Sequence, residues 1–173
     1  MSYLYGVHNT KFGDYVIAID SETHNILAGE FITPSNQNNL EQFIANFKKI
    51  YKNEIDLQLD QETTAEYITQ IFVYNKTNLP IELIGTEFQI KVWQALRKIP
   101  FGQTVSYQSI AEQINHPRAV RAVASSIARN KIAYLIPCHR VIRKTGKYHK
   151  YRWGSEIKKA MIESEQNPVD TVH

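Results

Sequence analysis

The stretch Leu135-Ile136-Pro137-Cys138-His139-Arg140-Val141-Ile142 holds the only cysteine among the 173 residues of the chain. Apolar runs enter and leave it, so a thiol and an imidazole lie at a proline-stiffened break in an otherwise buried pattern. A thiolate is the reactive form of cysteine, and cationic or imidazole neighbours lower the thiol pKa from about 8.5. His139 is adjacent to Cys138, and Arg140 and Lys144 follow closely. The stretch therefore favours a reactive cysteine, although an isolated Cys-His pair is also compatible with a buried thiol beside a structural histidine.

Length and composition exclude several classes of protein. With 43% hydrophobic residues, a chain of this length can bury the core of one ordinary domain or two small ones. A single cysteine excludes an internal disulfide framework and a zinc site built from several cysteines. The sequence also has no apolar stretch near the ~20 residues that a membrane span needs. We expect a protein of the reducing cytoplasm that acts as a monomer, without a membrane partner.

Charge is divided unevenly along the chain. Residues 1–84 contain five Lys, no Arg and eleven acidic residues, which gives −6, whereas residues 85–173 contain fifteen basic and six acidic residues, which gives +9. All seven arginines lie in the second part. Such a division indicates two units, of which the basic one faces a polyanion. A solvated basic face without a partner is the alternative.

The first half has the pattern of a small sheet with helices. Three short runs rich in aromatic and β-branched residues are separated by polar turns, which predicts antiparallel strands at residues 3–5, 15–19 and 26–31. Apolar residues at helical spacing predict an amphipathic helix over residues 40–51, and a weaker helical pattern follows over residues 65–72. A polar linker ends at Pro80. We therefore expect an N-terminal structural domain at residues 1–80 and a second domain at residues 81–173.

The second half contains start and stop signals for several helices. Thr86 and Gln89 have the spacing of a capping box, which predicts a helix that ends before Pro100. Ser106 is suited to cap the next helix. The turn Asn115-His116-Pro117 then leads to a further helix, with the proline at its first position.

The two helices after Ser106 form a predicted helix-turn-helix. Its second helix has an apolar side and, opposite, a basic side, and several small residues make the outer face narrow. A slim cationic helix can approach a nucleic-acid groove closely; an ordinary helical hairpin is the alternative. The expected inward residues are Val120, Val123, Ala124, Ile127 and Ala128. The basic side carries Arg118, Arg121, Ser125 and Arg129. The small residues are Ala119, Ala122, Ser125 and Ser126.

The remaining elements lead to the cysteine and away from it. Residues 132–136 are apolar throughout and predict a strand that ends just before Cys138. A closing helix is expected at residues 155–165, with Ile157, Ala160 and Met161 facing inward. The fold class is thus α/β in an α+β arrangement: a small sheet-and-helix domain followed by a mostly helical domain that carries a DNA-binding helix-turn-helix.

The order of motifs in the second half resembles that of the O6-alkylguanine-DNA alkyltransferases, and most closely the bacterial members with Tyr-Arg-Trp-Gly after the active site. The resemblance covers roughly half of the chain. The N-terminal half is similar only in its pattern of strands and helices. The motifs that carry the resemblance are Gly85-Thr86-Glu87-Phe88-Gln89, Trp93, Gly102-Gln103-Thr104-Val105-Ser106-Tyr107, Arg118-Ala119-Val120-Arg121-Ala122-Val123-Ala124, Asn130, Pro137-Cys138-His139-Arg140-Val141, Tyr151-Arg152-Trp153-Gly154 and Glu165.

The resemblance implies a DNA repair protein that takes the alkyl group from guanine O6 in double-stranded DNA onto its own cysteine, once and without a cofactor. Cys138 matches the acceptor, His139 the histidine that takes the thiol proton, and Glu165 the acid that orients the histidine. Asn130 matches the residue that ties the helix-turn-helix to the active-site segment. The backbone carbonyls of Cys138 and Val141 would read the guanine amino group.

The resemblance also implies DNA-binding residues. Tyr107 matches the tyrosine that donates to the flipped purine and crowds the phosphate, and flipping costs a few kcal/mol. Arg121 matches the finger that replaces the extruded base, while Gln108 and Lys144 lie near the DNA backbone. Chemistry favours the same interpretation, because an alkyl carbon on an aryl-like oxygen suits attack by a soft thiolate.

Two features distinguish this sequence from members of the family that it resembles. Members with a zinc site use cysteines that this chain lacks, so no metal is expected. Members usually have a small residue before the tyrosine of the Tyr-Arg-Trp-Gly motif, where this chain has Lys150 after His149. Two other functions remain open: a helix-turn-helix regulator with a sensor cysteine, and a cysteine hydrolase that uses Cys138 with a base from elsewhere in the chain.

Overall fold

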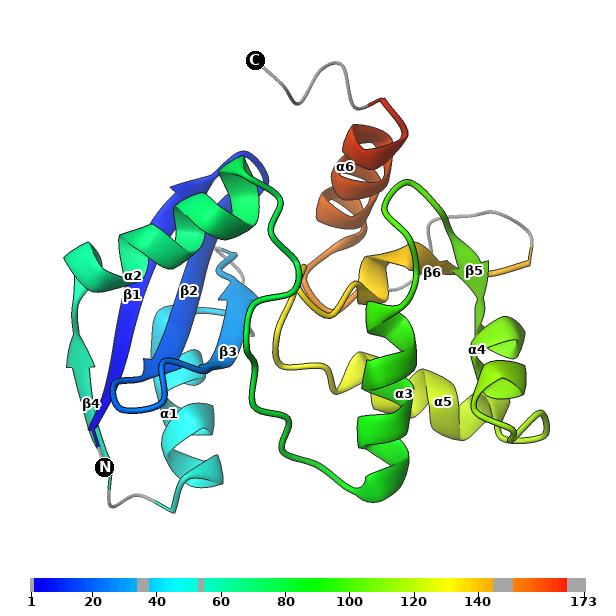
Figure 1. The fold of residues 1–173 in the computed structure, drawn as a ribbon, viewed down its shortest axis with the longest axis horizontal. Helices are drawn as coiled ribbons and strands as arrows, with labels where there is room; N and C mark the ends of the chain where they lie inside the picture. Colours follow the sequence, from blue (N-terminus) through cyan, green and yellow to red (C-terminus); the bar gives the residue numbers. More distant parts are fainter. Residues whose placement is uncertain (1, 34–37, 53–54, 145–150, 168–173) are drawn as a thin grey trace. The chain divides into compact units, whose positions relative to one another are not determined.

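A computed structural model describes residues 2–33, 38–52, 55–144 and 151–167. The chain (Figure 1) forms two compact units, and each unit is built from two separate segments of the sequence. Unit 1 contains residues 1–83 and also residues 131–135, whereas unit 2 contains residues 84–130 and 136–173. The segment just before the cysteine stretch therefore belongs to the first unit.

A four-stranded mixed sheet forms the centre of unit 1. The strands lie in the order β3-β2-β1-β4; β1 with β2 and β2 with β3 are antiparallel, as the sequence predicts, and β4 pairs parallel to β1. The sequence missed β4, whose four residues Asp-Leu-Gln-Leu lie at the sheet edge and are mostly exposed. The strands are β1 (Ser2–Thr10), β2 (Gly13–Asp20), β3 (Ile26–Phe31) and β4 (Asp56–Leu59).

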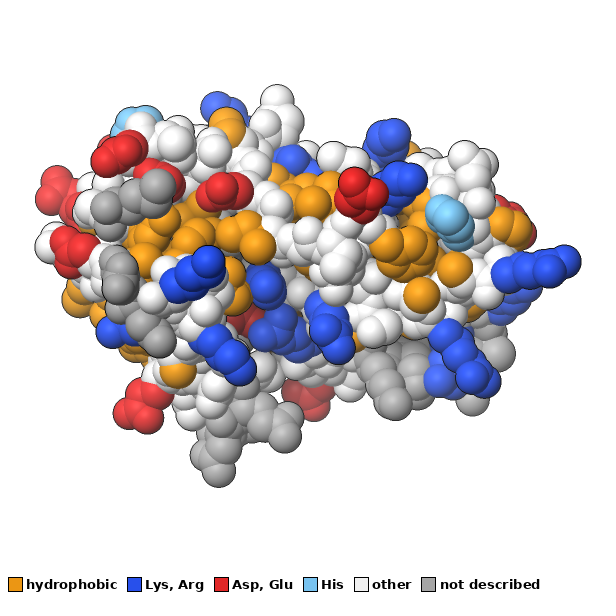
Figure 2. All heavy atoms as spheres, turned by 90° about the horizontal axis from the view of Figure 1, so that it is seen from below, with side chains coloured by type: hydrophobic (Ala, Val, Ile, Leu, Met, Phe, Trp, Pro, Cys, Tyr) orange, Lys and Arg blue, Asp and Glu red, His pale blue; other side chains and the backbone are white. Residues whose placement is uncertain are grey.

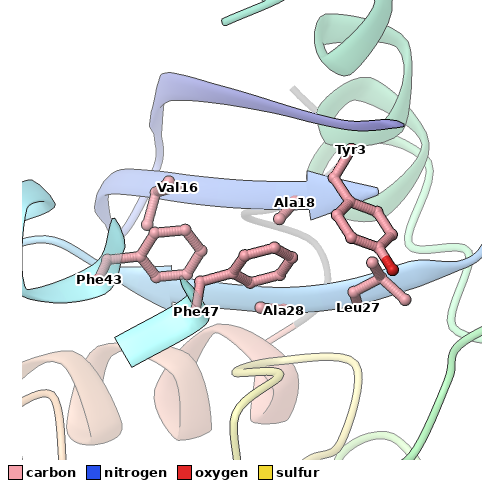
Figure 3. Packing of buried hydrophobic residues seen from close by; sticks show 7 residues of the cluster. All are labelled: Tyr3, Val16, Ala18, Leu27, Ala28, Phe43 and Phe47. Carbon is pink, nitrogen blue, oxygen red and sulfur yellow. The ribbon is translucent and has the colours of Figure 1, made fainter. Parts of the chain in front are cut away.

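Helices cover both faces of this sheet because alternate residues of β2 point to opposite sides. Helix α1 (Leu40–Ile50) packs Phe43 and Phe47 against Val16 and Ala18 (Figure 3). Helix α2 (Gln61–Ile68) continues as a π-helical turn, η1 (Thr69–Val73). Phe72 of that turn contacts Tyr15 of β2, with ring centroids 5.0 Å apart. Both predicted helices of this half are confirmed.

Unit 2 is mostly helical. Helices α3, α4 and α5 pack on one another, and two short strands pair in parallel, Val105 beside Val141. The elements are α3 (Glu87–Arg97), β5 (Val105–Ser106), α4 (Tyr107–Gln113), α5 (Val120–Ala128), the 3-10 turn η2 (Cys138–Arg140), β6 (Val141–Ile142) and α6 (Ser155–Gln166). No helix among the described residues is long and apolar enough to span a membrane.

The predicted helix caps are present in the structure. The Gln89 backbone N–H donates to Thr86 Oγ1 at 3.1 Å, and the Gln89 side chain accepts from the Thr86 N–H at 3.0 Å, which completes the capping box of α3. Ser106 accepts from the Ser109 N–H at the start of α4. These side chains satisfy backbone donors that have no partner within the helix.

The start predicted for α5 is wrong. The helix begins at Val120 rather than at Pro117. The Ala119 N–H donates to the His116 carbonyl at 2.9 Å, so Pro117 occupies the second position of a β-turn, where its fixed φ is also favourable. The inward side differs as well, because Ser126 is buried and Ala128 is exposed.

The strand predicted at residues 132–136 does not form. Ile132 makes one bridge to Gly29, after which the Leu135 N–H donates to the Ala133 carbonyl at 3.0 Å. This is a γ-turn centred on Tyr134, whose φ is +75°. An apolar run of this length predicts burial correctly, but it cannot distinguish a strand from a buried turn.

The closing helix α6 is present with a different inward face. Lys158, Met161, Ile162 and Glu165 are buried, whereas Ala160, which we expected inside, is exposed. The four buried positions follow the i, i+3, i+4, i+7 spacing of one helix face. The unusual residues His149 and Lys150 lie outside the described residues.

Candidate active site around Cys138

Two consecutive turns place Cys138 at the start of η2. Pro137 has φ −79° and ψ +61°, and the Cys138 N–H donates to the Ile136 carbonyl at 2.7 Å, which is an inverse γ-turn. The Arg140 N–H then donates to the Pro137 carbonyl at 3.0 Å. Cys138 is 4% exposed. The predicted proline break therefore holds the thiol in a defined and buried place.

Asn130 connects the end of α5 to this turn. Its side-chain amide donates to the Ile136 carbonyl at 3.0 Å and lies 3.2 Å from Cys138 Sγ. The Asn130 carbonyl accepts from Arg152 at 2.8 Å. A donor on the sulfur favours its charged form, because the thiolate is the better acceptor.

His139, Arg140 and Glu165 form a buried network beside the cysteine. His139 Nε2 and Glu165 Oε1 are 2.8 Å apart, and Arg140 donates to both carboxylate oxygens of Glu165, at 2.8 and 2.9 Å. Arg140 also donates to the Ile99 carbonyl at 2.8 Å. Burial alone would raise the pKa of Glu165, but its hydrogen bonds and charged partners lower that pKa to about 2. The carboxylate is thus ionised at neutral pH.

The ionised carboxylate fixes the tautomer of His139. A carboxylate only accepts hydrogen bonds, so Nε2 of His139 carries the proton and Nδ1 is the accepting nitrogen of the neutral ring. Burial lowers the pKa of His139, against the opposing effect of Glu165. The resting site therefore pairs a neutral imidazole with a neutral thiol, because burial also raises the pKa of Cys138.

Lys158 is a functional candidate that the sequence analysis missed. Its side chain is 1% exposed, and Nζ donates to the Val141 carbonyl at 2.8 Å. Its positive charge opposes the burial effect on the pKa of Cys138, together with hydrogen bonds from Asn130 and Tyr151. The sequence does carry a signal for it, because Lys158, Met161 and Glu165 have the spacing of one helix face.

The other predicted site residues lie on different elements of unit 2. Tyr107, the first residue of α4, is half-buried, and its pKa is raised by burial and by the neighbouring Cys138. Gln108 donates to the Pro117 carbonyl at 3.0 Å, so its amide closes the turn between α4 and α5. Arg121 and Lys144 are exposed residues outside the cysteine network.

The outer side of α5 is basic, as the sequence predicts. Arg121 and Ser125 lie on the helix, Arg118 lies in the turn before it and Arg129 caps its C-terminal end; all four are exposed. Figure 2 shows acidic side chains gathered over unit 1 and a group of basic side chains over unit 2. Among the described residues, no group of three or more His, Cys, Asp or Glu side chains could hold a metal ion.

Comparisons with known proteins match this arrangement to one family. Residues 87–167 match the family model described as 6-O-methylguanine DNA methyltransferase, DNA binding domain. A probable methylated-DNA–protein-cysteine methyltransferase of Acanthamoeba polyphaga mimivirus is 35% identical over 157 residues, which cover 91% of this chain and 93% of that protein. The bifunctional transcriptional activator/DNA repair enzyme Ada of Escherichia coli is 55% identical over 87 residues, which cover 50% of this chain and 25% of that protein.

Solved structures give the same result for the fold. The O6-methylguanine methyltransferase of Mycobacterium tuberculosis has a TM-score of 0.74 at 27% identity, with 95% of this chain and 93% of that chain covered. A further structure of the mycobacterial protein is a complex with DNA. The chain spans between 25% and 60% of the length of the first curated relatives that it matches. Because the mimiviral match extends over nearly the whole of both proteins, the chain belongs to the methylated-DNA–protein-cysteine methyltransferase family.

Proposed function

We propose that the protein repairs DNA by transferring the alkyl group of O6-alkylguanine to its own Cys138, in one event without turnover. The observation that carries this proposal is the buried thiol 3.2 Å from the Asn130 amide, adjacent in sequence to a histidine that is bonded to an ionised carboxylate. Family membership supports the proposal, because the relatives are named for this transfer.

The chemistry follows from the states of the side chains. His139 is neutral and takes the thiol proton on its accepting nitrogen through a water, as the resemblance implies, and Glu165 stabilises the imidazolium that results. The Cys138 thiolate attacks the alkyl carbon. A sulfur–carbon bond forms as the carbon–O6 bond breaks, and the electron pair of the broken bond remains on the purine. The proton that His139 took from the thiol is then given up to neutralise the purine, so the imidazole returns to its neutral form. The product is a thioether, and this chemistry supplies no step that removes it, so each molecule reacts once and needs no cofactor.

Burial contributes to the attack. The thiolate is formed out of water, where Asn130 and Lys158 compensate its charge in place of solvent. Fixed donors of this kind stabilise charge without the cost of reorganising solvent. In this proposal Val141 offers its carbonyl to the guanine amino group, as does the carbonyl of Cys138.

DNA binding is assigned to α4 and α5 of unit 2. The exposed arginines on either side of α5, Arg118 and Arg129, neutralise phosphates, and Arg121 of α5 enters the duplex in place of the flipped guanine. Tyr107, at the start of α4 and near the thiol, donates to the flipped base. Gln108 and Lys144 approach the DNA backbone in the bound state. A structure of the mycobacterial relative in complex with DNA, and the match of residues 87–167 to a DNA-binding-domain model, support DNA binding by this part of the chain.

Intact-mass measurement tests the proposal directly. After the protein is mixed with duplex DNA that contains O6-methylguanine, the mass should rise by one methyl group, and peptide mapping should place it on Cys138. Cys138→Ser should bind the same DNA and gain no methyl. Methyl on another residue would refute the proposed acceptor, and sequence-specific DNA binding without any methyl transfer would favour a regulator instead.

A further inference from the structure

The segment of chain that leads to Cys138 belongs to unit 1, although Cys138 itself belongs to unit 2. Asn130 and Ile136 belong to unit 2, but the five residues between them belong to unit 1. Both ends of this segment meet at the site, because the Asn130 amide bonds the Ile136 carbonyl and Cys138 Sγ. The conformation of residues 131–135 therefore bears directly on the contact between Asn130 and the sulfur.

This segment has a conformation that needs support. Tyr134 has a φ of +75°, and the Leu135 N–H closes the γ-turn on the Ala133 carbonyl. A positive φ is costly for a bulky residue and persists only where the surroundings impose it. Removing those supports should allow the segment, and with it Asn130, to relax.

Tyr15 bonds the atom that closes the turn. Its hydroxyl donates to the same Ala133 carbonyl at 2.7 Å, and the side chain is fully buried. Gly29 holds the segment from β3, with its N–H on the Lys131 carbonyl at 2.9 Å and its carbonyl on the Ala133 N–H at 2.7 Å. A Cβ at Gly29 would collide with the Tyr15 hydroxyl oxygen. The glycine therefore allows the hydroxyl to reach its acceptor.

The side chain of Tyr134 is held as well. Its ring lies 4.8 Å from that of Phe72, and its hydroxyl donates to Asn75 Oδ1 at 2.9 Å. These contacts hold the middle of the turn, whereas Tyr15 and Gly29 hold its backbone.

We propose that Tyr15 is a positioning residue for alkyl transfer: its hydroxyl, seated on Gly29, holds the γ-turn that sets the Asn130 amide against the Cys138 sulfur. The proposal rests on the proposed function, and it gives unit 1 a part in the reaction. Tyr15 acts through Ala133 and Asn130, and its loss should impair the chemical step rather than the binding of DNA.

The first test is Tyr15→Phe, which removes one oxygen and keeps the ring. Single-turnover methyl transfer at saturating DNA should be about tenfold slower, with the dissociation constant for DNA unchanged. The pH profile of the rate of Cys138 alkylation by iodoacetamide should shift to higher pH, because a displaced Asn130 amide stabilises the thiolate less. Tyr67→Phe is the matched control, because it also removes a unit 1 hydroxyl that donates to a backbone carbonyl, that of His24. It should leave the rate and the pH profile unchanged.

Gly29→Ala provides a second variant at the same contact. It should slow transfer to a similar extent, and the double variant with Tyr15→Phe should be no slower than either single one, because both act through one hydroxyl. Additive losses, a wild-type rate in Tyr15→Phe, or a fall in melting temperature with an unmoved pH profile would overturn the proposal. If the unaltered protein transferred no methyl, the proposed function itself would fail, which is a different result.

Discussion

Cys138 lies among groups that act on its thiol in opposite directions. Burial raises the pKa of the thiol, whereas the Asn130 amide, the Lys158 charge and the Tyr151 hydroxyl lower it. The site thus keeps the thiol protonated at rest and offers compensation for its charge when the proton leaves.

Lys158 provides the first prediction at this scale. Lys158→Met keeps the bulk of the side chain and removes its charge, so methyl transfer at neutral pH should be about tenfold slower or more. The pH profile of Cys138 alkylation by iodoacetamide should move to higher pH, and Lys158→Arg should restore part of the rate. Lys159→Met, at the exposed neighbouring position of α6, is the control. An unmoved profile in Lys158→Met would show that the buried ammonium only holds the Val141 carbonyl.

Glu165 provides the second prediction. Its folded pKa of about 2 lies below the usual value of 4.5, so its ionised form stabilises the fold above pH 4.5, and that contribution is lost as the pH falls toward 2. Glu165→Gln leaves the Arg140 charge buried without its carboxylate, which should cost about 3–5 kcal/mol of unfolding free energy. Denaturant unfolding from pH 2 to 7 should show a flatter acid limb in the variant. Equal acid sensitivity in both proteins would contradict the ionised state of Glu165.

At the scale of elements, the proposed function assigns DNA binding to α4 and α5 and the chemistry to the network around Cys138. Arg121 is exposed on α5, outside the hydrogen-bond network of Cys138. Arg121→Ala should therefore slow repair of duplex DNA by about tenfold or more, the size of a lost contact worth 1.4 kcal/mol, and leave the reaction with the free modified base nearly unchanged. Lys91→Ala, at an exposed position of α3, should affect neither reaction. Equal losses on both substrates would mean that Arg121 supports the fold.

The elements also show what the sequence could predict. Two helix starts could be predicted from Thr86, Gln89 and Ser106, because capping depends on side chains within four residues of the helix start. Strand β4 was missed because its polar–apolar alternation covers only four residues, too few to distinguish a strand from a loop, and because the strand is mostly exposed at the sheet edge. The turns at Tyr134 and Pro137 depend on partners far away in sequence, such as Tyr15, and local preference does not encode them.

Among the site residues, too, those with a local signal could be predicted and those that depend on distant partners could not. Cys138 and His139 were evident from the stretch itself, and the resemblance supplied Asn130 and Glu165, which the structure brings beside them. Lys158 was missed because a lysine on a helix usually faces solvent. Its burial becomes understandable only once the Val141 carbonyl and the thiol lie beside it.

At the scale of the whole molecule, the two units differ in charge. Unit 1 has six basic and eleven acidic residues, which gives −5, and unit 2 has fourteen basic and six acidic residues, which gives +8, so unit 2 is the one suited to contact with a polyanion. Binding to duplex DNA should weaken with added salt, because each neutralised phosphate releases counterions. Unit 1, in turn, takes in the five residues that lead to the nucleophile.

The most direct test of this account is the stoichiometry of transfer. Duplex DNA with a labelled O6-methylguanine is added in increasing excess, and both protein-bound label and repaired guanine are counted. We expect both to reach a plateau together at one equivalent per protein molecule, and protein first alkylated at Cys138 should transfer none. Repair that continues beyond one equivalent, or repaired guanine without label on the protein, would contradict a single irreversible transfer to Cys138.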